Sequence, residues 1–396
     1  MPLTHDAFLE AFRNAEAIQR EGRFGDAAQA WKSIAAAAPD SAQTWHKLGG
    51  ALFELGQYAD AEACLRAAVT LRPETFWANY SLGTFLHQTG RWAEAEAPYR
   101  RGLAAADHPA LRTDLGLLLL GLGRFPEGWA LYESRKALPD AEEPLDQPTP
   151  WNGEPLEGRR LLIWPEQGFG DQIQFARLAP LLQSRGVEVI LVAPPPLVPL
   201  FAELPVKVMA QRPNLTVPKP DFWVAPASIP HNLDLELADI DPAPYLHAPA
   251  AASAKWAGHA QPGSIGYAWR GKAHHDNDRR RSMAGPEVLL GLLKRTRAHL
   301  VDLTDPLGDF ADMAAVIEQL DLVITVDTAV AHLAGALGKP CWVMLPWFGQ
   351  DWRWMQGRND SPWYANTRLY RQPAQGDWAA VMQAIGQDLI TEGWLG

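Results

Sequence analysis

The feature that most constrains this chain is a glycine that returns at a fixed interval near its beginning. Gly22, Gly56 and Gly90 are 34 residues apart, and Gly123 follows after 33. A fixed period of this length is typical of a helical-repeat architecture, in which each unit stacks on its neighbours to bury one face. The first third of the chain should therefore be an array of helix pairs.

The residues after each glycine repeat as well. Each repeat has an aromatic residue, a small residue three positions later and a large residue four beyond that: Phe24, Ala27 and Trp31; Tyr58, Ala61 and Leu65; Trp92, Ala95 and Tyr99; Phe125, Gly128 and Tyr132. Residues four apart share a helix face, so the small residue admits the neighbouring helix and the large one fills the seam. Leu-Gly pairs at 48–49, 82–83 and 115–116 indicate close helix crossings.

This pattern resembles the tetratricopeptide repeat, with about three and a half repeats over residues 5–137. The first helices of such repeats line a groove suited to an extended or helical polypeptide. Related O-linked N-acetylglucosamine transferases carry an asparagine ladder in this groove. The corresponding positions here are Arg13, Lys47, Ser81 and Asp114.

Composition narrows the remaining possibilities. The 396 residues are 47% hydrophobic, and no apolar run reaches the roughly 18 residues of a membrane helix, so we expect a soluble multidomain protein with no membrane span. A net charge of -11 disfavours a nucleic-acid partner. The N-terminal residues lack the apolar core of a secretory signal, which predicts a cytoplasmic protein. Cys64 and Cys341 fit reduced, buried thiols, with no structural metal.

A change in composition marks the end of the repeats. The linker at 138–157 is rich in proline and acidic residues and has no helical or strand period. Beyond it, short apolar runs alternate with helical segments, which predicts parallel, doubly wound sheets. The expected strands lie at 160–164, 187–192, 265–269, 300–303, 322–326 and 341–345. A Pro- and Ala-rich stretch divides this part into two lobes, at 158–250 and 262–396, with the site in the cleft between them.

A glycine-rich turn follows the first expected strand of this part and opens a helix. Gly168 and Gly170 let the backbone turn tightly and place Asp171 at the mouth of the cleft. A carboxylate there can accept a proton, and the alternative is that it caps the first turn of the helix. We expect Asp171 to be catalytic and its neighbours to line the acceptor side of the cleft: Gln167, Gly168, Gly170, Gln172 and Gln174.

A second motif follows the apolar strand at 322–326. Asp327 and Thr328 lead into a helix of small residues, whose free N–H groups, with the Thr328 hydroxyl, form a cradle for a diphosphate. His332 lies one turn further on and can reach the same phosphates. The alternative is a core histidine bonded to the backbone.

A basic loop at 269–282 follows another expected strand. It holds five cations, among them Arg270 and Lys272, in a chain that is acidic overall. Such a loop is either a solvated surface or the partner of an anion, and its place at the end of a sheet strand favours phosphate contact.

Together these elements resemble the lipopolysaccharide heptosyltransferases of glycosyltransferase family nine, and more closely the bacterial proteins that fuse tetratricopeptide repeats to such a domain. The resemblance implies a GT-B fold of two Rossmann-like lobes, here with a trimmed first lobe. It also implies that Asp171 deprotonates an acceptor hydroxyl, which attacks the anomeric carbon with inversion. Lys272, Thr328 and His332, with Arg270 and Asp327, would bind the donor and its departing diphosphate, with no metal or other cofactor.

The function expected from these features is glycosyl transfer from a nucleotide sugar, most simply to a protein hydroxyl that the repeats present. Two alternatives stay open. One is transfer to a glycan or a lipid-linked saccharide, and the other is a non-catalytic repeat scaffold that only binds a nucleotide sugar. Many of the 17 tryptophans lie in the tail after residue 346, where packing is their expected use.

Overall fold

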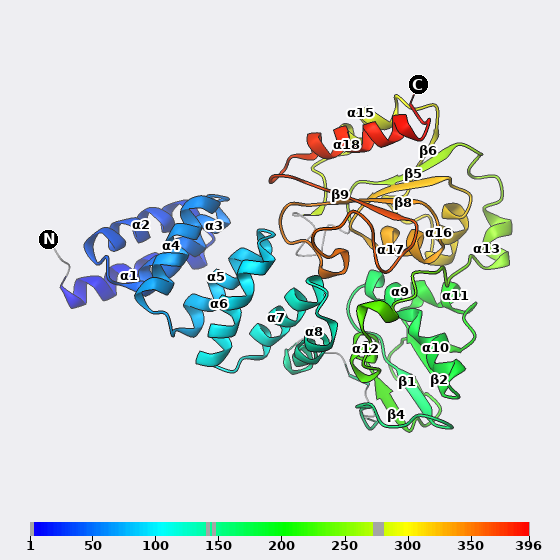
Figure 1. The fold of residues 1–396 in the computed structure, drawn as a ribbon, viewed down its shortest axis with the longest axis horizontal. Helices are drawn as coiled ribbons and strands as arrows, with labels where there is room; N and C mark the ends of the chain where they lie inside the picture. Colours follow the sequence, from blue (N-terminus) through cyan, green and yellow to red (C-terminus); the bar gives the residue numbers. More distant parts are fainter. Residues whose placement is uncertain (1–3, 140–142, 145–147, 272–280, 396) are drawn as a thin grey trace. The chain divides into compact units, whose positions relative to one another are not determined.

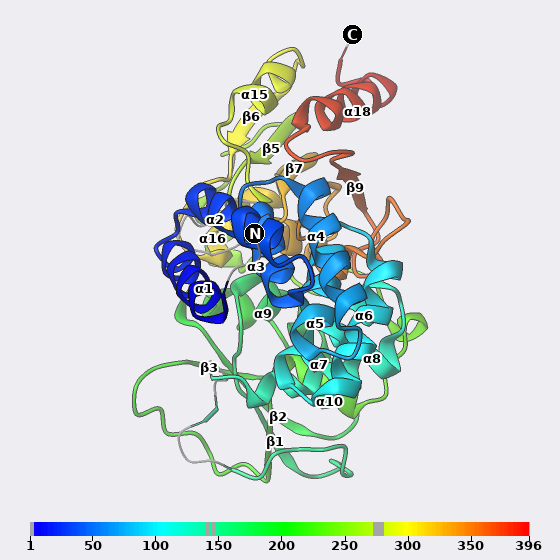
Figure 2. The ribbon, with the colours of Figure 1, turned by 90° about the vertical axis from the view of Figure 1, so that its left-hand side faces the viewer.

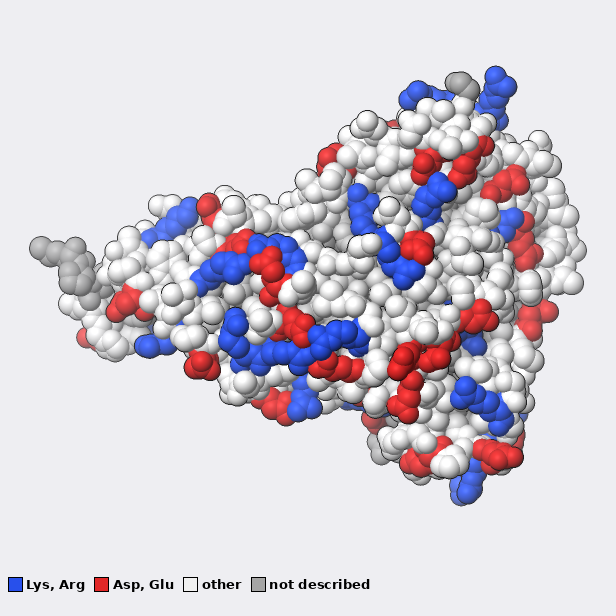
Figure 3. All heavy atoms as spheres, viewed as in Figure 1, with Lys and Arg blue, Asp and Glu red and all other residues white. Residues whose placement is uncertain are grey.

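The structure is a computed structural model that describes residues 4–139, 143–144, 148–271 and 281–395 (Figure 1). The chain divides into two compact units, Met1–Leu118 and Leu119–Gly396. Among the described residues, no helix is long and apolar enough to cross a bilayer. Figure 3 shows acidic and basic side chains interspersed over the face that it displays.

The first unit consists of antiparallel helix pairs. Its helices are α1 (His5–Arg20), α2 (Phe24–Ala37), α3 (Ala42–Glu54), α4 (Tyr58–Leu71), α5 (Phe76–Gln88), α6 (Trp92–Ala105) and the start of α7 (Pro109–Gly121). The periodic glycines lie between the two helices of each pair, at φ values of 72° to 80°. A residue with a Cβ atom is strained in this left-handed conformation, which explains why glycine recurs there.

The small and large residues of the repeat meet as expected. A Cβ atom on Gly83 would lie 2.3 Å from Tyr99 Cδ1, and one on Gly49 would lie 2.8 Å from Leu65 Cγ. Both large side chains are almost fully buried. The first helix of each of these pairs therefore crosses the second closely enough that only glycine fits.

The first helices are also linked to one another by polar contacts. Lys47 Nζ of α3 lies 2.6 Å from Glu16 Oε1 of α1. His46 Nε2 lies 2.7 Å from Ser81 Oγ of α5. The Tyr80 hydroxyl of α5 donates to Asp114 Oδ2 of α7 at 2.8 Å. Three of the four expected groove positions thus pair with the preceding first helix.

The second unit contains two parallel sheets, and Figures 1 and 2 show them at opposite ends of the unit. The first sheet has the order β3-β2-β1-β4, with β1 (Arg160–Ile163), β2 (Glu188–Ala193), β3 (Lys207–Ala210) and β4 (Phe222–Val224). The second has the order β6-β5-β7-β8-β9, with β5 (Ser264–Ala268), β6 (His299–Asp302), β7 (Leu322–Val326), β8 (Cys341–Leu345) and β9 (Thr367–Arg371). All pairings within these sheets are parallel.

Helices accompany both sheets. Those of the first lobe and of the connection to the second are α9 (Phe169–Ala176), α10 (Leu178–Ser184), α11 (Val198–Phe201), α12 (Ile229–Asn232) and α13 (Ala250–Lys255). Those of the second lobe are α15 (Glu287–Leu293), α16 (Phe310–Ile317), α17 (Ala329–Ala336) and α18 (Trp378–Thr391). A helical repeat array followed by two parallel α/β lobes confirms the predicted fold class.

One boundary differs from the repeat pattern. The last repeat motif forms α8 (Phe125–Tyr132) and a 3-10 turn, η1 (Glu133–Ala137), but both belong to the second compact unit. The reason is packing. Trp129 of α8 contacts Trp352 and Phe175, with ring centroids 5.3 Å and 6.3 Å apart, so the helix is buried against the α/β part.

Candidate active site

The turn after β1 brings the two lobes together. The Gly168 N–H donates to Asp171 Oδ2 at 2.9 Å, which closes the first turn of α9. A Cβ atom on Gly170 would lie 2.7 Å from the ring of His332 in α17. The first turn of α9 in the first lobe thus packs so closely on α17 in the second lobe that only a glycine fits at position 170.

Asp171 also forms an ion pair that joins the lobes. Its Oδ1 accepts a hydrogen bond from Arg353, which lies on the segment after β8. Arg353 Nη1 also lies 2.9 Å from Asp351 Oδ2, and its Nε donates to Gln174 Oε1. The Arg353 side chain is 6% exposed. Asp171 therefore both caps its helix, as the structural alternative required, and faces a buried cation.

The acidity of Asp171 reflects these surroundings. Burial raises its pKa above the ordinary value, and the Arg353 charge acts against this. Asp351 raises the pKa further, and the Gly168 hydrogen bond lowers it. The carboxylate is thus poised between a buried setting that favours its protonated form and a cation that favours its ionised form.

His332 lies in the same buried cluster. Its Nδ1 is 2.9 Å from the Tyr364 hydroxyl, and its ring stacks on Trp354 with centroids 5.4 Å apart. Burial first, and then the charge of Arg353, lower its pKa to about 3. The imidazole is therefore neutral near pH 7. The core-histidine alternative supposed a hydrogen bond to the backbone, whereas His332 bonds to the side chain of Tyr364. When Tyr364 donates to Nδ1, the ring hydrogen is on Nε2.

Asp327 and Thr328 lie at the carboxyl end of β7, as their sequence position predicts. Each residue is 9% exposed. Thr328 Oγ1 accepts a hydrogen bond from Val330 N at 3.3 Å, so this hydroxyl caps α17. Burial and the charge of Asp351 raise the pKa of Asp327 to about 6. Within the described residues, no three His, Cys, Asp or Glu side chains gather as a metal site.

The basic loop is described only at its ends. Arg270 follows β5, and its Nη2 lies 2.8 Å from Asp305 Oδ1, with its guanidinium over the Trp269 ring. Its recorded ion pair is thus with Asp305 and not with the Asp171 cluster. Lys272 lies outside the described residues.

The polar residues expected to line the acceptor side have other surroundings. Gln172 and Gln174 are 2% and 0% exposed. The Gln172 amide donates to the Glu166 carbonyl, and Gln174 accepts from Arg353. Both side chains are thus buried and bonded within the protein, beside the turn that carries Asp171. The Gln167 amide donates to the Tyr132 hydroxyl at 2.5 Å.

Arg353 is the main residue that the sequence did not single out. It stands between two tryptophans in a segment for which packing was the expected use. A charged residue flanked by large aromatics in an apolar segment is only a weak indication of a functional site. Its significance depends on an aspartate 182 positions away.

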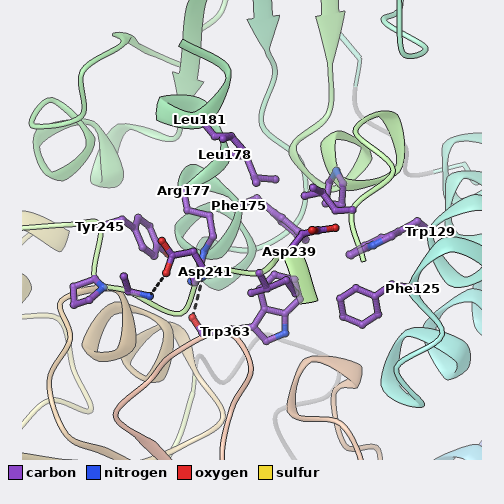
Figure 4. A pocket seen from close by; sticks show the side chains of 15 residues that line it. Phe125, Trp129, Phe175, Arg177, Leu178, Leu181, Asp239, Asp241, Tyr245 and Trp363 are labelled. Carbon is purple, nitrogen blue, oxygen red and sulfur yellow. Dashed lines mark hydrogen bonds between the residues drawn. The ribbon is translucent and has the colours of Figure 1, made fainter. Parts of the chain in front are cut away.

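A cavity of about 230 Å³ is lined in part by Phe175, the ring of which also contacts Arg353 (Figure 4). Its lining includes Phe125 and Trp129 of α8, Phe175 of α9 and Trp363. Arg177 Nη1 donates to the carbonyl of Asp241 at 3.0 Å and to that of Trp363 at 2.9 Å. The cavity wall thus combines residues from both lobes and from the last repeat motif.

Comparisons with known families find a match within each part of the chain. The tetratricopeptide-repeat model matches residues 12–73 and 46–109. The model of glycosyltransferase family 9 (heptosyltransferase) matches residues 287–343, which include Asp327, Thr328 and His332. This match supports glycosyl transfer as the class of reaction.

Individual relatives share parts of the chain. Protein FlbA of Caulobacter vibrioides is 28% identical over 343 residues, which cover 72% of this chain and 57% of FlbA, so this chain spans little more than half of that protein's length. The structure of MamA from Desulfovibrio magneticus is 22% identical over 33% of this chain and 75% of its own, with a TM-score of 0.31. A thermophilic repeat protein of Thermus thermophilus is 24% identical over 31% of this chain and 69% of its own, with a TM-score of 0.29.

The chain thus carries tetratricopeptide repeats in its first part and, in its α/β part, a partial match to glycosyltransferase family 9, the heptosyltransferases.

Proposed function

We propose that the second unit transfers a sugar from a nucleotide-sugar donor to a hydroxyl group of a polypeptide that the repeats bind. The reaction inverts the anomeric carbon, and Asp171 is the general base. The observation that carries this proposal is the contact between the first turn of α9 and α17. Through this contact, the carboxylate of Asp171 in the first lobe lies near α17 in the second lobe. Helix α17 lies within residues 287–343, the segment that matches glycosyltransferase family 9.

The chemistry follows from this arrangement. Asp171 takes the proton of the acceptor hydroxyl as its oxygen attacks the anomeric carbon. The bond from that carbon to the diphosphate oxygen breaks, and the negative charge develops on the diphosphate. The N-terminal end of α17 and the Nε2–H of neutral His332 favour that charge. The charge of Arg353 lowers the pKa of the buried Asp171 and so favours the ionised form, which can accept a proton.

The repeats of the first unit are the reason for proposing a polypeptide acceptor. Tetratricopeptide repeats present the first helix of each pair along one groove, and such surfaces bind extended or helical peptides. The linked pairs from Glu16 to Asp114 give that groove polar side chains that can contact a peptide backbone.

Donor binding is tested by thermal shift against a panel of UDP-, GDP-, ADP- and CMP-sugars, because a ligand that binds only the folded protein raises its melting temperature. We expect one donor class to raise it, and His332→Ala to reduce the shift. Asp171→Asn should retain the shift, since the base acts on the acceptor. Transfer is then measured as a mass increase of one sugar on co-incubated polypeptides.

The same experiment separates the alternatives. Asp171→Asn should abolish transfer, whereas the exposed acid variant Asp360→Asn should not. Normal transfer by Asp171→Asn would show that Asp171 is not the general base. Transfer to a free glycan instead of a polypeptide would show that the acceptor is a glycan. A melting temperature unchanged by every donor would argue against nucleotide-sugar binding altogether.

A further inference from the structure

The last repeat motif forms part of the wall of the cavity in Figure 4. Phe125 and Trp129 of α8 pack against rings from both lobes: Phe175 of the first lobe, and Trp352 and Trp363 of the second. Figure 4 shows Phe125 and Trp129 beside the same cavity as Phe175 and Trp363. This motif is therefore an integral part of the second unit, although its sequence is that of a repeat.

Arg135 of η1 connects this motif to the turn before Asp171. Its Nε and Nη2 lie 3.0 Å and 2.9 Å from the two carboxylate oxygens of Glu166, in a bidentate pair. Nη2 also donates to Ser228 Oγ at 2.8 Å. The two side chains of the pair are only 8% and 13% exposed. Burial alone would lower the pKa of Arg135, but the Glu166 carboxylate raises it above its ordinary value.

Glu166 is in turn fixed to the turn that carries the base. Its Oε1 accepts from the Ala227 N–H at 2.9 Å, and its carbonyl accepts from Gln172 in α9. Gln167, the next residue, has a φ of 63°. This conformation is unfavourable for a residue other than glycine and persists only where its surroundings enforce it. Here the hydrogen bond from Gln167 to the Tyr132 hydroxyl holds it.

We propose that Arg135 and Tyr132 are positioning residues for the turn at 165–168, and that through this turn they set the place of the Asp171 carboxylate. The end of the repeat array is then a functional part of the transfer site. This inference rests on the proposed function for its kinetic consequence, but the positioning itself is independent of which sugar is transferred. A purely structural role for Arg135 is the competing explanation.

The kinetic test separates positioning from stability. Arg135→Met should lower kcat by about 10- to 100-fold, since small misplacements of a catalytic group have effects of this size. The KM for the donor should stay unchanged, because the donor binds to the second lobe. Arg135→Lys keeps the charge without the bidentate geometry, and should recover part of kcat. Arg124→Lys, in an exposed ion pair at the start of α8, is the matched control and should leave kcat unchanged.

A double variant addresses folding. Arg135→Met leaves Glu166 buried without its cation, which destabilises the protein, and adding Glu166→Leu removes that charge. We expect the melting temperature to recover in the double variant while kcat stays low. Recovery of kcat together with the melting temperature would show a structural role only and would overturn the proposal.

Hydrogen–deuterium exchange provides a readout that does not need activity. Tyr132→Phe removes only the hydroxyl that holds Gln167, and should speed exchange at residues 166–169 while the sheets keep their protection. Unchanged exchange there would overturn the positioning. If the wild-type protein transfers no sugar from any donor, the proposed function fails, and this exchange experiment still decides the positioning.

Discussion

At the scale of single residues, the candidate base depends on one guanidinium. Arg353 lies between Asp171 of the first lobe and Asp351 of its own segment, and all three groups are at least partly buried. Burial favours the neutral form of Asp171, and the Arg353 charge and the Gly168 hydrogen bond act against it. The pKa of Asp171 therefore depends on burial first, and then on the charges of Arg353 and Asp351.

Two substitutions should move this equilibrium in opposite directions. Asp171 must be ionised to act as a base, so the rate falls as the pH drops through its pKa. Arg353→Met removes the cation that lowers this pKa, and the acidic limb of the kcat profile should shift to higher pH. Asp351→Asn removes a charge that raises the pKa, and the limb should shift to lower pH.

The measurement is kcat against pH for the three proteins, with folding checked at each pH. Equal shifts of the limb in both variants, or no shift in either, would contradict this account. Asp360→Asn, an exposed acid paired with Arg358, should leave the profile unchanged.

The sequence predicted some of these residues and not others. Asp171, Asp327 and His332 follow strands in glycine-rich or small-residue motifs, so their place at the carboxyl ends of strands follows from local pattern. Arg353 could not be predicted in this way because its partner is 182 positions earlier, and only the packing of two lobes brings them together. The same holds for the hydrogen bond that Gln174 accepts from Arg353, because its two partners are 179 positions apart.

At the scale of elements, the repeat period creates polar links between successive first helices. Tyr80 and Asp114 are 34 positions apart, one repeat length, and therefore occupy equivalent places on α5 and α7. Burial raises the pKa of Asp114 to about 6, with the Tyr80 hydrogen bond acting against this. The folded protein thus binds a proton at Asp114 more tightly than the unfolded chain does.

This linkage predicts a pH-dependent stability. A raised carboxyl pKa means that stability is lost as the pH rises from about 4 to about 6, because ionisation is easier in the unfolded chain. Asp114→Asn removes the charge at every pH, and its amide oxygen can still accept from Tyr80. The variant should be more stable than the wild type by on the order of 1–3 kcal/mol above pH 7. The difference should vanish near pH 4.

Urea denaturation at pH 4 and pH 7.5 measures this difference. The control is Asp107→Asn, an acid of the same unit that is 67% exposed, which should have little effect at either pH. A variant that is equally stable or less stable at pH 7.5 would show that the Asp114 charge is not unfavourable in the folded protein.

The elements themselves were predictable to different degrees. β7 and β8 coincide with the expected apolar runs at 322–326 and 341–345, because central strands buried on both faces are continuously apolar. β3, β4 and β9 were not expected. β3 and β4 are short, and β9, on an edge of its sheet, has a threonine and two arginines among its five residues, so none of them forms a long apolar run.

At the scale of the whole molecule, the boundary between the parts of the chain depends on which property is followed. The repeat motif continues to Tyr132, and the proline-rich composition begins after residue 137. The compact units instead divide between Leu118 and Leu119. The two boundaries differ in where they put α8 and η1. The sequence of this segment is that of a repeat, but the segment packs against the α/β part.

Two fragments should therefore behave differently. Residues 109–396 keep α7, α8 and η1, and should unfold cooperatively near the temperature at which the second unit unfolds in the full chain. Residues 138–396 expose Phe175, Trp352 and Trp363 and leave Glu166 without Arg135. Loss of one partner of a buried ion pair alone costs about 3–5 kcal/mol. This shorter fragment should aggregate or melt at a much lower temperature.

Calorimetry and size-exclusion chromatography of the two fragments provide the measurement. A third fragment, 138–396 with Glu166→Leu, removes the unpaired charge and should regain part of the lost stability but not the aromatic packing. Equal melting temperatures for 109–396 and 138–396 would mean that α8 contributes nothing to the second unit. In that case α8 would belong with the repeats, and the proposed transfer site would be built from the two lobes alone.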